Sequence, residues 1–219
     1  MELFTARVCP YAHRSRLLLL EKGLEFEHTE IDFKNKSARF LKASPYGKVP
    51  ALVHDGQTIY ESLIINEYLD EVFPTPRLMP EDPVLKARVR IWNHYCGEYY
   101  TTDQYALMKN KEPERNAELL AKVHDRMRFV ETEGLASLSG DGPYWLGAEI
   151  SLIDLAWYPY FERLPAWTHY RGLTIPADCP RLAAWAAAMS GRPSVKDIAN
   201  DEDYYIANYQ GYAGAVMAA

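Results

Sequence analysis

Four prolines within ten residues divide this chain into two stretches with different sequence patterns. They are Pro74, Pro76, Pro80 and Pro83. Because proline fixes its own backbone and cannot continue a helix, this composition predicts a stiff linker. Strand-like and helix-like segments alternate before the prolines, and helical spacing prevails almost everywhere after them. We therefore expect a first domain at residues 1–75, a proline-rich linker at 76–83 and an all-helical domain at 84–219.

The first stretch predicts elements in the order β-α-β-α-β-β-α. The hairpin is the clearest signal, because Asp55-Gly56 separates two strand-like runs and supplies the positive φ angles of a type I′ turn. The expected segments are a strand at 3–6, a helix at 11–23, a strand at 25–33, a short helix or turn at 36–42, strands at 51–54 and 57–60, and a helix at 64–73. This order, with a cysteine at the first strand–helix junction, resembles a thioredoxin-like domain.

The all-helical stretch contains two predicted apolar faces. The first comprises Val84, Ala87, Ile91, Trp92, Tyr95 and Tyr99, and the second comprises Leu120, Val123, Met127, Val130 and Leu138. A further amphipathic helix is expected at 181–189. Ser151 and Asp154 have the spacing of a capping box, and Ile150 and Leu155 that of a hydrophobic staple, so we assign these residues to helix initiation.

Composition argues against several classes of function. Thirty acidic and 24 basic residues give a net charge of −6, which argues against bulk nucleic-acid binding. No apolar run approaches the roughly 20 residues of a membrane span, and the N-terminus does not read as a signal peptide. Three cysteines match neither a disulfide framework nor a metal-ligand spacing. We expect a reduced, cytoplasmic protein with no metal, no nucleic-acid partner and no membrane partner.

The segment Cys9-Pro10-Tyr11-Ala12 carries the strongest chemical signal. Pro10 suits the first position of a helix, which places Cys9 at the N-cap. Unpaired N–H groups and the helix dipole favour a thiolate there, and such settings lower a cysteine pKa from about 8.5 to between roughly 3.5 and 7.5. The alternative is an inert, buried thiol. For Cys96 and Cys179, an inert, buried thiol is the favoured interpretation. His13 is expected to be an exposed helix residue rather than a catalytic base.

Taken together, the motifs resemble the cytosolic glutathione transferases, within them the cysteine-type, omega-like group. The resemblance covers nearly the whole chain. The segments that carry it are Cys9-Pro10-Tyr11-Ala12, Asn35-Lys36, Ser44-Pro45-Tyr46-Gly47-Lys48-Val49-Pro50, Ile59-Tyr60-Glu61-Ser62, Glu67-Tyr68-Leu69, Ser151-Leu152-Ile153-Asp154 and Arg192-Pro193-Ser194-Val195. The implied architecture is an α/β thioredoxin-like domain that binds glutathione, followed by an all-helical domain that forms the electrophile pocket.

The resemblance also implies a glutathione site. Val49-Pro50 looks like the motif in which a cis proline exposes the preceding backbone for strand-like pairing. Glu61 looks like the partner of the ligand's α-ammonium group, and Ser62, at a helix start, looks like the donor to its γ-glutamyl carboxylate. Lys36 looks like the partner of the glycyl carboxylate. Lys48 stands where omega-like proteins often carry an apolar residue, so it either adds a charge there or faces water.

Each of these residues also has a purely structural interpretation. Pro50 can be an ordinary trans proline, Glu61 and Ser62 can be capping residues, and Lys36 can be a solvated lysine. The aromatic residues on segments that would face the cleft can belong to the core instead. They are Tyr11, Tyr95, Tyr99, Tyr105, Trp157 and Tyr160. For Tyr204, Tyr205, Tyr209 and Tyr212 near the C-terminus, capping of the cleft and contact with a neighbouring subunit both remain open.

Ala12 stands where a dithiol oxidoreductase would carry its second cysteine, so we expect a monothiol mechanism at Cys9 with glutathione as co-substrate. The resemblance adds deglutathionylation or dehydroascorbate reduction, a small electrophile or glutathionylated substrate as partner, and a homodimer. An isomerase, etherase or dehalogenase that acts on small organic substrates is one alternative. A non-enzymatic scaffold or regulator of the same fold is another.

Overall fold

The computed structural model describes residues 1–214. It separates into two compact units, Met1–Lys86 and Ala87–Ala219, which are considered one at a time. The first unit contains β1 (Glu2–Thr5), α1 (Pro10–Glu21), β2 (Glu27–Glu30), α2 (Ala38–Ala43), β3 (Ala51–His54), β4 (Gln57–Tyr60) and α3 (Ser62–Val72). The predicted order of elements is confirmed, although β2 is shorter than the strand expected at 25–33.

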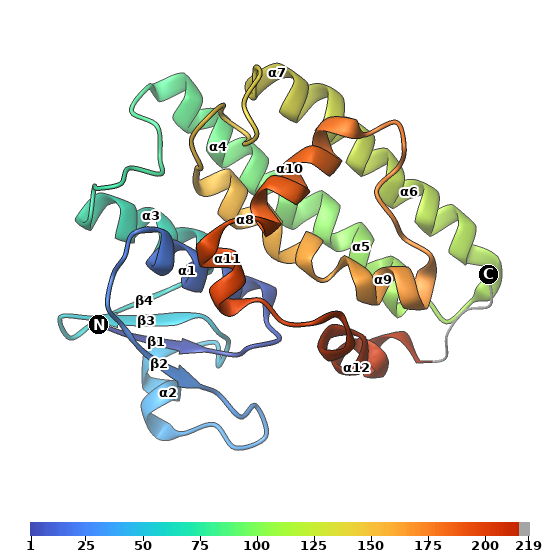
Figure 1. The fold of residues 1–219 in the computed structure, drawn as a ribbon. Helices are drawn as coiled ribbons and strands as arrows, with labels where there is room; N and C mark the ends of the chain where they lie inside the picture. Colours follow the sequence, from blue (N-terminus) through green and yellow to red (C-terminus); the bar gives the residue numbers. More distant parts are fainter. Residues whose placement is uncertain (215–219) are drawn as a thin grey trace. The chain divides into compact units, whose positions relative to one another are not determined.

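The first unit is a four-stranded mixed sheet with helices on both faces. The strand order is β2-β1-β3-β4; β1 pairs parallel with β2 and antiparallel with β3, and β3 pairs antiparallel with β4. Helices α1 and α3 pack together on one side of this sheet, and α2 packs on the other against β3 and β4 (Figure 1). Asp55 and Gly56 have φ angles of 48° and 75°, which confirms the predicted hairpin turn.

A buried ion pair fixes the proline-rich segment to the first unit. Lys22 Nζ lies 2.7 Å from the Asp70 carboxylate, and their side chains are 0% and 3% exposed. Lys22 also donates to the carbonyls of Phe73 and Pro76, each at 2.7 Å. Asp70 accepts hydrogen bonds from the backbone N–H groups of Leu78 and Met79. The charged pair therefore supplies the hydrogen bonds that the irregular segment after α3 cannot make within itself.

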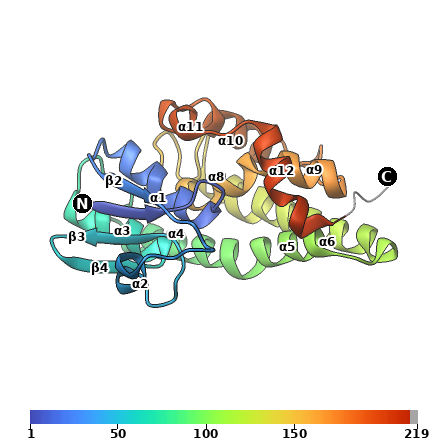
Figure 2. The same ribbon diagram turned by 90° about the horizontal axis from the view of Figure 1, so that it is seen from below.

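The second unit is helical, as expected (Figure 2). Its elements are α4 (Pro83–Tyr95, which begins in the first unit), the π-helix η1 (Cys96–Tyr100), α5 (Thr101–Lys109), the short η2 (Pro113–Arg115), α6 (Asn116–Phe129), the π-helix η3 (Val130–Leu135), α7 (Ala136–Leu138), α8 (Leu152–Glu162), α9 (Leu164–Arg171), α10 (Pro180–Ser190), α11 (Pro193–Ile198) and α12 (Glu202–Ala213).

The first predicted apolar face is confirmed at Trp92 and wrong at Val84 and Ile91, whereas the middle of the second face is confirmed. Val84 and Ile91 are 65% and 55% exposed, and Val89, which was not predicted, is buried beside Trp92. The helix carries apolar residues on two sides, and the periodicity did not reveal which side is packed. Val123, Met127 and Val130 of the second face are buried, while Leu120 and Leu138 are half-buried.

The predicted capping box starts α8. The Asp154 carboxylate accepts from the Ser151 N–H at 2.8 Å and from the Ser151 hydroxyl at 2.7 Å. It also accepts from the backbone N–H of Trp145 and from Trp185 Nε1. Burial raises the pKa of Asp154 despite these four donors. Asp154 therefore holds together the start of α8, the loop before it and α10.

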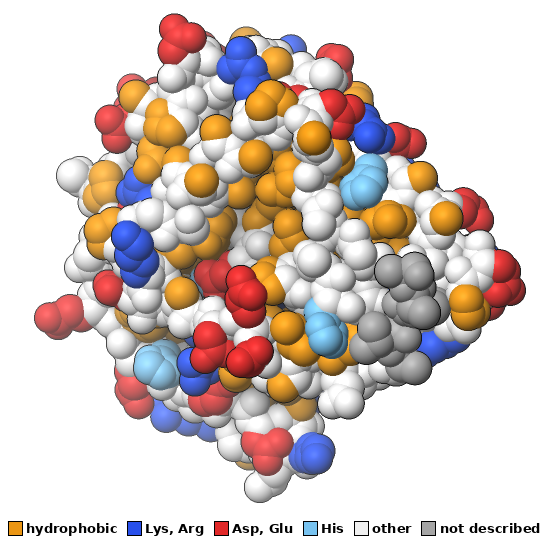
Figure 3. Space-filling model, turned by 45° about the vertical axis from the view of Figure 1, so that its right-hand side comes forward, with side chains coloured by type: hydrophobic (Ala, Val, Ile, Leu, Met, Phe, Trp, Pro, Cys, Tyr) orange, Lys and Arg blue, Asp and Glu red, His pale blue; other side chains and the backbone are white. Residues whose placement is uncertain are grey.

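On the face drawn in Figure 3, several acidic side chains gather near the centre, and basic side chains are scattered around them. Within residues 1–214, no helix is long and apolar enough to cross a membrane.

Candidate active site

Cys9 lies at the N-cap of α1, with Pro10 as the first helical residue. Its N–H donates to Ala6 O at 2.9 Å, and its carbonyl accepts the first helical hydrogen bond from His13 N at 3.0 Å. The thiol is half-buried, and its Sγ donates to the Val49 carbonyl over 3.8 Å. The sulfur therefore stands at the positive end of a helix, which favours a thiolate. The contact with the Val49 carbonyl is one that the protonated thiol makes.

A pocket of about 350 Å³ opens next to this sulfur contact. Its lining comprises Tyr11, Ser44, Tyr46, Lys48, Val49, Pro50, Tyr60, Glu61 and Ser62. Six of these residues were candidates from the sequence, and three elements bring them together: the start of α1, the loop between α2 and β3, and the start of α3. The volume falls in the range of small-molecule sites.

The loop between α2 and β3 presents backbone to this pocket. The Val49-Pro50 peptide bond is cis. The Ser44 hydroxyl donates to Lys48 O at 2.6 Å and accepts from Lys48 N at 3.0 Å, which closes the loop just before Val49. Within residues 1–214 the Val49 N–H has no hydrogen-bond acceptor. A ligand amide can therefore pair with it as an added strand would.

The start of α3 forms the opposite wall. Glu61 has a φ of 71°, a left-handed conformation that is uncommon for a glutamate, and its side chain is exposed. Ser62 is buried and is the first residue of α3, so an anion at its hydroxyl would also meet the free N–H groups of the helix start. Strained backbone of this kind is concentrated at ligand sites. This wall therefore offers a carboxylate to a cation and a helix N-terminus to an anion.

Arg14 is expected from the sequence only as a positive charge near Cys9, and the structure adds a contact with Ser62 of the pocket lining. Its Nη1 donates to Ser62 Oγ at 3.3 Å, and its guanidinium lies 5.2 Å from the centre of the Tyr11 ring. Arg14 is buried, and so is His13, which corrects the expectation of an exposed histidine. Both residues are buried because they lie one helical turn after Cys9, where α3 packs against α1.

Lys36 lies outside the pocket lining. It is exposed, and its Nζ stands 5.9 Å from the centre of the Phe33 ring. A Cβ placed on Gly47 would lie 3.2 Å from the same Nζ, so the lysine runs alongside the loop that carries Lys48. Lys48 itself is exposed and lines the pocket.

The aromatic candidates of the helical unit contact other residues of that unit. Trp157 is fully buried, and its Nε1 donates to Trp92 O at 3.2 Å, so it belongs to the helical core. Tyr95 and Tyr99 are stacked with their ring centres 5.1 Å apart, and Tyr99 is 45% exposed. Tyr95 lines a second pocket of about 360 Å³ with Lys122, Asp125, Arg126 and Phe129.

The remaining tyrosines pack within the helical unit. Tyr160 is fully buried. The hydroxyls of Tyr105 and Tyr209 are 2.9 Å apart, and Tyr205 is hydrogen-bonded to Glu162. Tyr212 lies 6.2 Å from Tyr105 between ring centres, and Tyr204 is half-buried. The tyrosines of α12 thus hold that helix against its neighbours.

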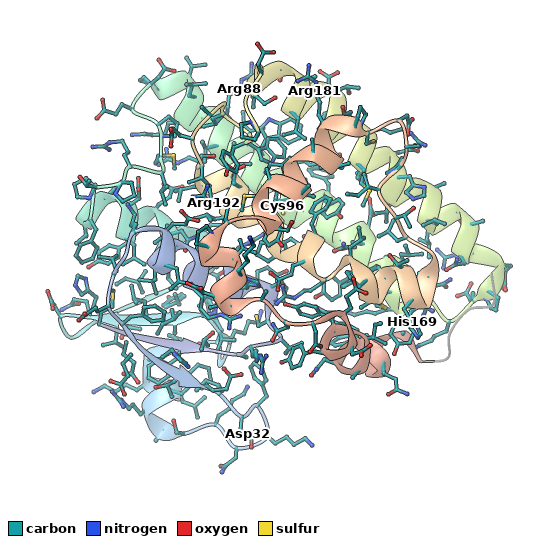
Figure 4. All side chains as sticks on the ribbon, viewed as in Figure 1. Asp32, Arg88, Cys96, His169, Arg181 and Arg192 are labelled. Carbon is teal, nitrogen blue, oxygen red and sulfur yellow. The ribbon has the colours of Figure 1, made fainter. Side chains whose placement is uncertain are left out.

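The other two cysteines are buried, as predicted. Cys96, labelled in Figure 4, starts η1, and its Sγ lies 3.8 Å from Ala156 O. Burial, together with the negative charges of Asp178 and Glu131, raises the pKa of Cys179 to about 11. Among residues 1–214, no group of three histidine, cysteine or acidic side chains could hold a metal ion.

Fold and site together define a class of thioredoxin-like proteins that carry an additional helical domain. Two family models match in the corresponding order. Residues 8–72 match the N-terminal domain of glutathione S-transferases, and residues 114–188 match their C-terminal domain. This chain belongs to the glutathione S-transferase family.

The curated relatives come from more than one class of that family. Glutathione S-transferase U19 of Arabidopsis thaliana is 32% identical over 84% of this chain and 83% of the relative. Glutathione S-transferase omega-2 of Rattus norvegicus is 32% identical over 94% of this chain and 81% of the relative. The second comparison agrees with the omega-like resemblance.

Solved structures of glutathione transferases support the same family assignment. Glutathione transferase Omega 3C from Trametes versicolor superposes with a TM-score of 0.87 at 33% identity, covering 96% of this chain and 89% of the other. Rice GST1 in complex with glutathione superposes with a TM-score of 0.85 at 28% identity, covering 96% and 94%.

Proposed function

We propose that this protein is a glutathione-dependent thiol transferase in which Cys9 is the nucleophile. The observation that carries the proposal is the position of the Cys9 thiol at the N-cap of α1, in contact with the carbonyl of Val49, which lines the pocket of about 350 Å³. A cysteine so placed is activated by the helix start and lies within reach of a disulfide sulfur bound at Val49. The omega-class relatives support the use of glutathione as the co-substrate.

Glutathione is assigned to the pocket of the first unit. The Val49 N–H would pair with its cysteinyl backbone, Glu61 with its α-ammonium group and Ser62 with its γ-glutamyl carboxylate. Lys36 and Lys48, which flank the same loop, are assigned to the glycyl end. Residues 1–75 would thus form the glutathione domain, and residues 84–219, after the linker at 76–83, would supply the electrophile pocket, with Tyr95 and Tyr99 as its expected aromatic residues. Trp157 is buried in the helical core and is not assigned to that pocket, and Tyr11 lines the pocket of the first unit.

The reaction proceeds in two exchanges. The Cys9 thiolate attacks the glutathionyl sulfur of a mixed disulfide; the Cys9–glutathione disulfide forms, and the product leaves as a thiolate. The thiolate of a second glutathione then attacks the glutathionyl sulfur on Cys9. Oxidised glutathione forms, and the Cys9 thiolate is released. Reduction of a mixed disulfide that already carries a glutathionyl group consumes one free glutathione. Reduction of a disulfide without such a group consumes two.

The direct test is the Cys9→Ser variant with a glutathione mixed disulfide as substrate. We expect thiol transfer to fall by at least about a hundredfold, because serine cannot form the disulfide intermediate. The control is Cys179→Ala, which removes a buried thiol and should leave the rate unchanged. Mass spectrometry of the wild-type protein should find one glutathionyl group on the Cys9 peptide. Full activity in Cys9→Ser would refute the proposal.

Two other functions are tested by further experiments, an alternative enzymatic activity by substrate profiling and a scaffold role by glutathione binding. Glutathione-dependent isomerase, etherase or dehalogenase activity that survives in the Cys9→Ser variant would assign the pocket to that chemistry. Failure of the wild-type protein to bind immobilised glutathione would indicate a non-enzymatic scaffold. We further expect a homodimer, which sedimentation analysis tests, and a cytoplasmic location, which fractionation tests.

A further inference from the structure

The segment from Asp32 to Lys48 has a charge opposite to that of the whole protein. It carries five cationic residues and one acidic residue, in a chain whose net charge is −6. Arg39 is paired with Glu2, and Asp32, labelled in Figure 4 on the loop before α2, accepts a hydrogen bond from the backbone N–H of Lys34. The four lysines that remain are Lys34, Lys36, Lys42 and Lys48, here called the lysine surface.

The lysine surface carries uncompensated charge. All four side chains are exposed, and none of them forms an ion pair with another residue of the described part of the chain, 1–214. This distinguishes them from Lys22 and Lys122, which are each 2.7 Å from a carboxylate oxygen. Surface lysines without an ion-pair partner attract acidic partners. This electrostatic attraction extends over about one Debye length, which is roughly 8 Å at physiological salt.

Two of the four lysines, Lys36 and Lys48, adjoin the pocket. A Cβ on Gly47 would lie 3.2 Å from Lys36 Nζ and 3.6 Å from Leu41 Cδ2, so both side chains lie against the loop whose next residue, Lys48, lines the pocket. Phe33 lies beyond Lys36, 5.9 Å from its Nζ. Phe33 and Leu41 are 48% and 49% exposed, which adds two apolar contacts between the charges.

From this placement we propose that Lys34 and Lys42 of the lysine surface bind the acidic flank of a glutathionylated polypeptide, while the glutathionyl group occupies the pocket with its glycyl end at Lys36 and Lys48. The inference rests on the proposed function and names its substrate class. A polypeptide fits better than a membrane, because the lysines lie on loops and on a six-residue helix beside a pocket rather than along one face of a long amphipathic helix. Two exposed apolar side chains among charges are typical of protein contacts.

Binding is measured with the Cys9→Ser protein, which cannot turn the ligand over. The probes are three fluorescent peptides of equal length, each glutathionylated on one cysteine and flanked by glutamates, by glutamines or by lysines. The variants are Lys34→Glu, Lys42→Glu and the double variant, because neither residue is assigned to the glutathione site. Lys196→Glu is the matched control, an exposed lysine on α11.

We expect the acidic peptide to bind most tightly and to lose affinity as salt is raised. The double variant should weaken its binding by roughly tenfold at low salt, whereas the glutamine peptide should change by less than about twofold. Lys196→Glu should have no such selective effect. Equal effects on the acidic and glutamine peptides would overturn the inference. Binding of phosphatidylserine vesicles through Lys34 and Lys42, without preference for the acidic peptide, would overturn it in favour of a membrane.

This experiment separates the inference from the proposed function. Charge-selective binding to Cys9→Ser together with no thiol transfer by the wild-type protein would leave the docking surface intact and refute the enzyme. Thiol transfer on a small neutral disulfide with no charge selectivity would do the reverse.

Discussion

Replacement of Asp70 by alanine tests whether the buried pair with Lys22 fixes the segment that leaves the first unit. The change leaves the ammonium group of Lys22 buried and without its counter-ion, which costs roughly 3–5 kcal/mol. It also removes the acceptor of two backbone N–H groups, at about 1 kcal/mol or more each. Partial relaxation of the segment offsets part of this, so we expect the free energy of unfolding to fall by about 5 kcal/mol.

Urea unfolding followed by far-ultraviolet circular dichroism gives that number. Lys22→Met alone should cost roughly 3–5 kcal/mol, and the double variant Lys22→Met/Asp70→Ala should cost less than the sum of the two by about 3 kcal/mol, since they break the same contact. The control is Glu81→Gln, which breaks the exposed ion pair with Arg77 and should cost less than about 1 kcal/mol. A loss in Asp70→Ala no larger than in Glu81→Gln would refute the reasoning.

Three further predictions concern the helical unit and the pocket. Burial alone would raise the pKa of Asp103, but two basic side chains of α6 lower it below its ordinary value. Asp103→Asn should therefore cost on the order of 1–2 kcal/mol at pH 7, and the difference should shrink as pH falls below about 4; a melting-temperature difference that does not vary with pH would contradict this. Gly134→Ala should cost roughly 1–3 kcal/mol in urea unfolding, because its Cβ would lie 2.7 Å from the Trp145 ring; an unchanged midpoint would show that the indole moves freely. Arg14→Met should weaken glutathione binding by about tenfold in calorimetry, through loss of the hydrogen bond to Ser62, and an unchanged Kd would remove Arg14 from the site.

The parts of the fold that the sequence predicts well are those set by local chemistry. Asp55-Gly56 predicts its turn because few residues accept two positive φ angles in succession. Pro10 and the Ser151–Asp154 spacing predict helix starts because capping involves residues that are neighbours in sequence. Each of these signals is contained within about four residues.

The parts that were missed depend on what packs against an element. Helix α4 has apolar residues on both sides, and only the tertiary structure selects Val89 and Trp92 over Ile91. The Lys22–Asp70 pair joins positions that carry no local sign of being buried. Arg14 reaches the site through Ser62, 48 residues away, a contact that no spacing rule predicts.

The pH dependence of Cys9 alkylation tests the central claim most directly. Iodoacetamide labelling, followed by mass spectrometry of the Cys9 peptide, reports the fraction of this sulfur that is ionised at each pH. Cys179 supplies an internal contrast, since burial raises its pKa to about 11. If the start of α1 stabilises a Cys9 thiolate, half-maximal labelling falls well below about pH 8; half-maximal labelling at about pH 8.5 or higher would contradict the account.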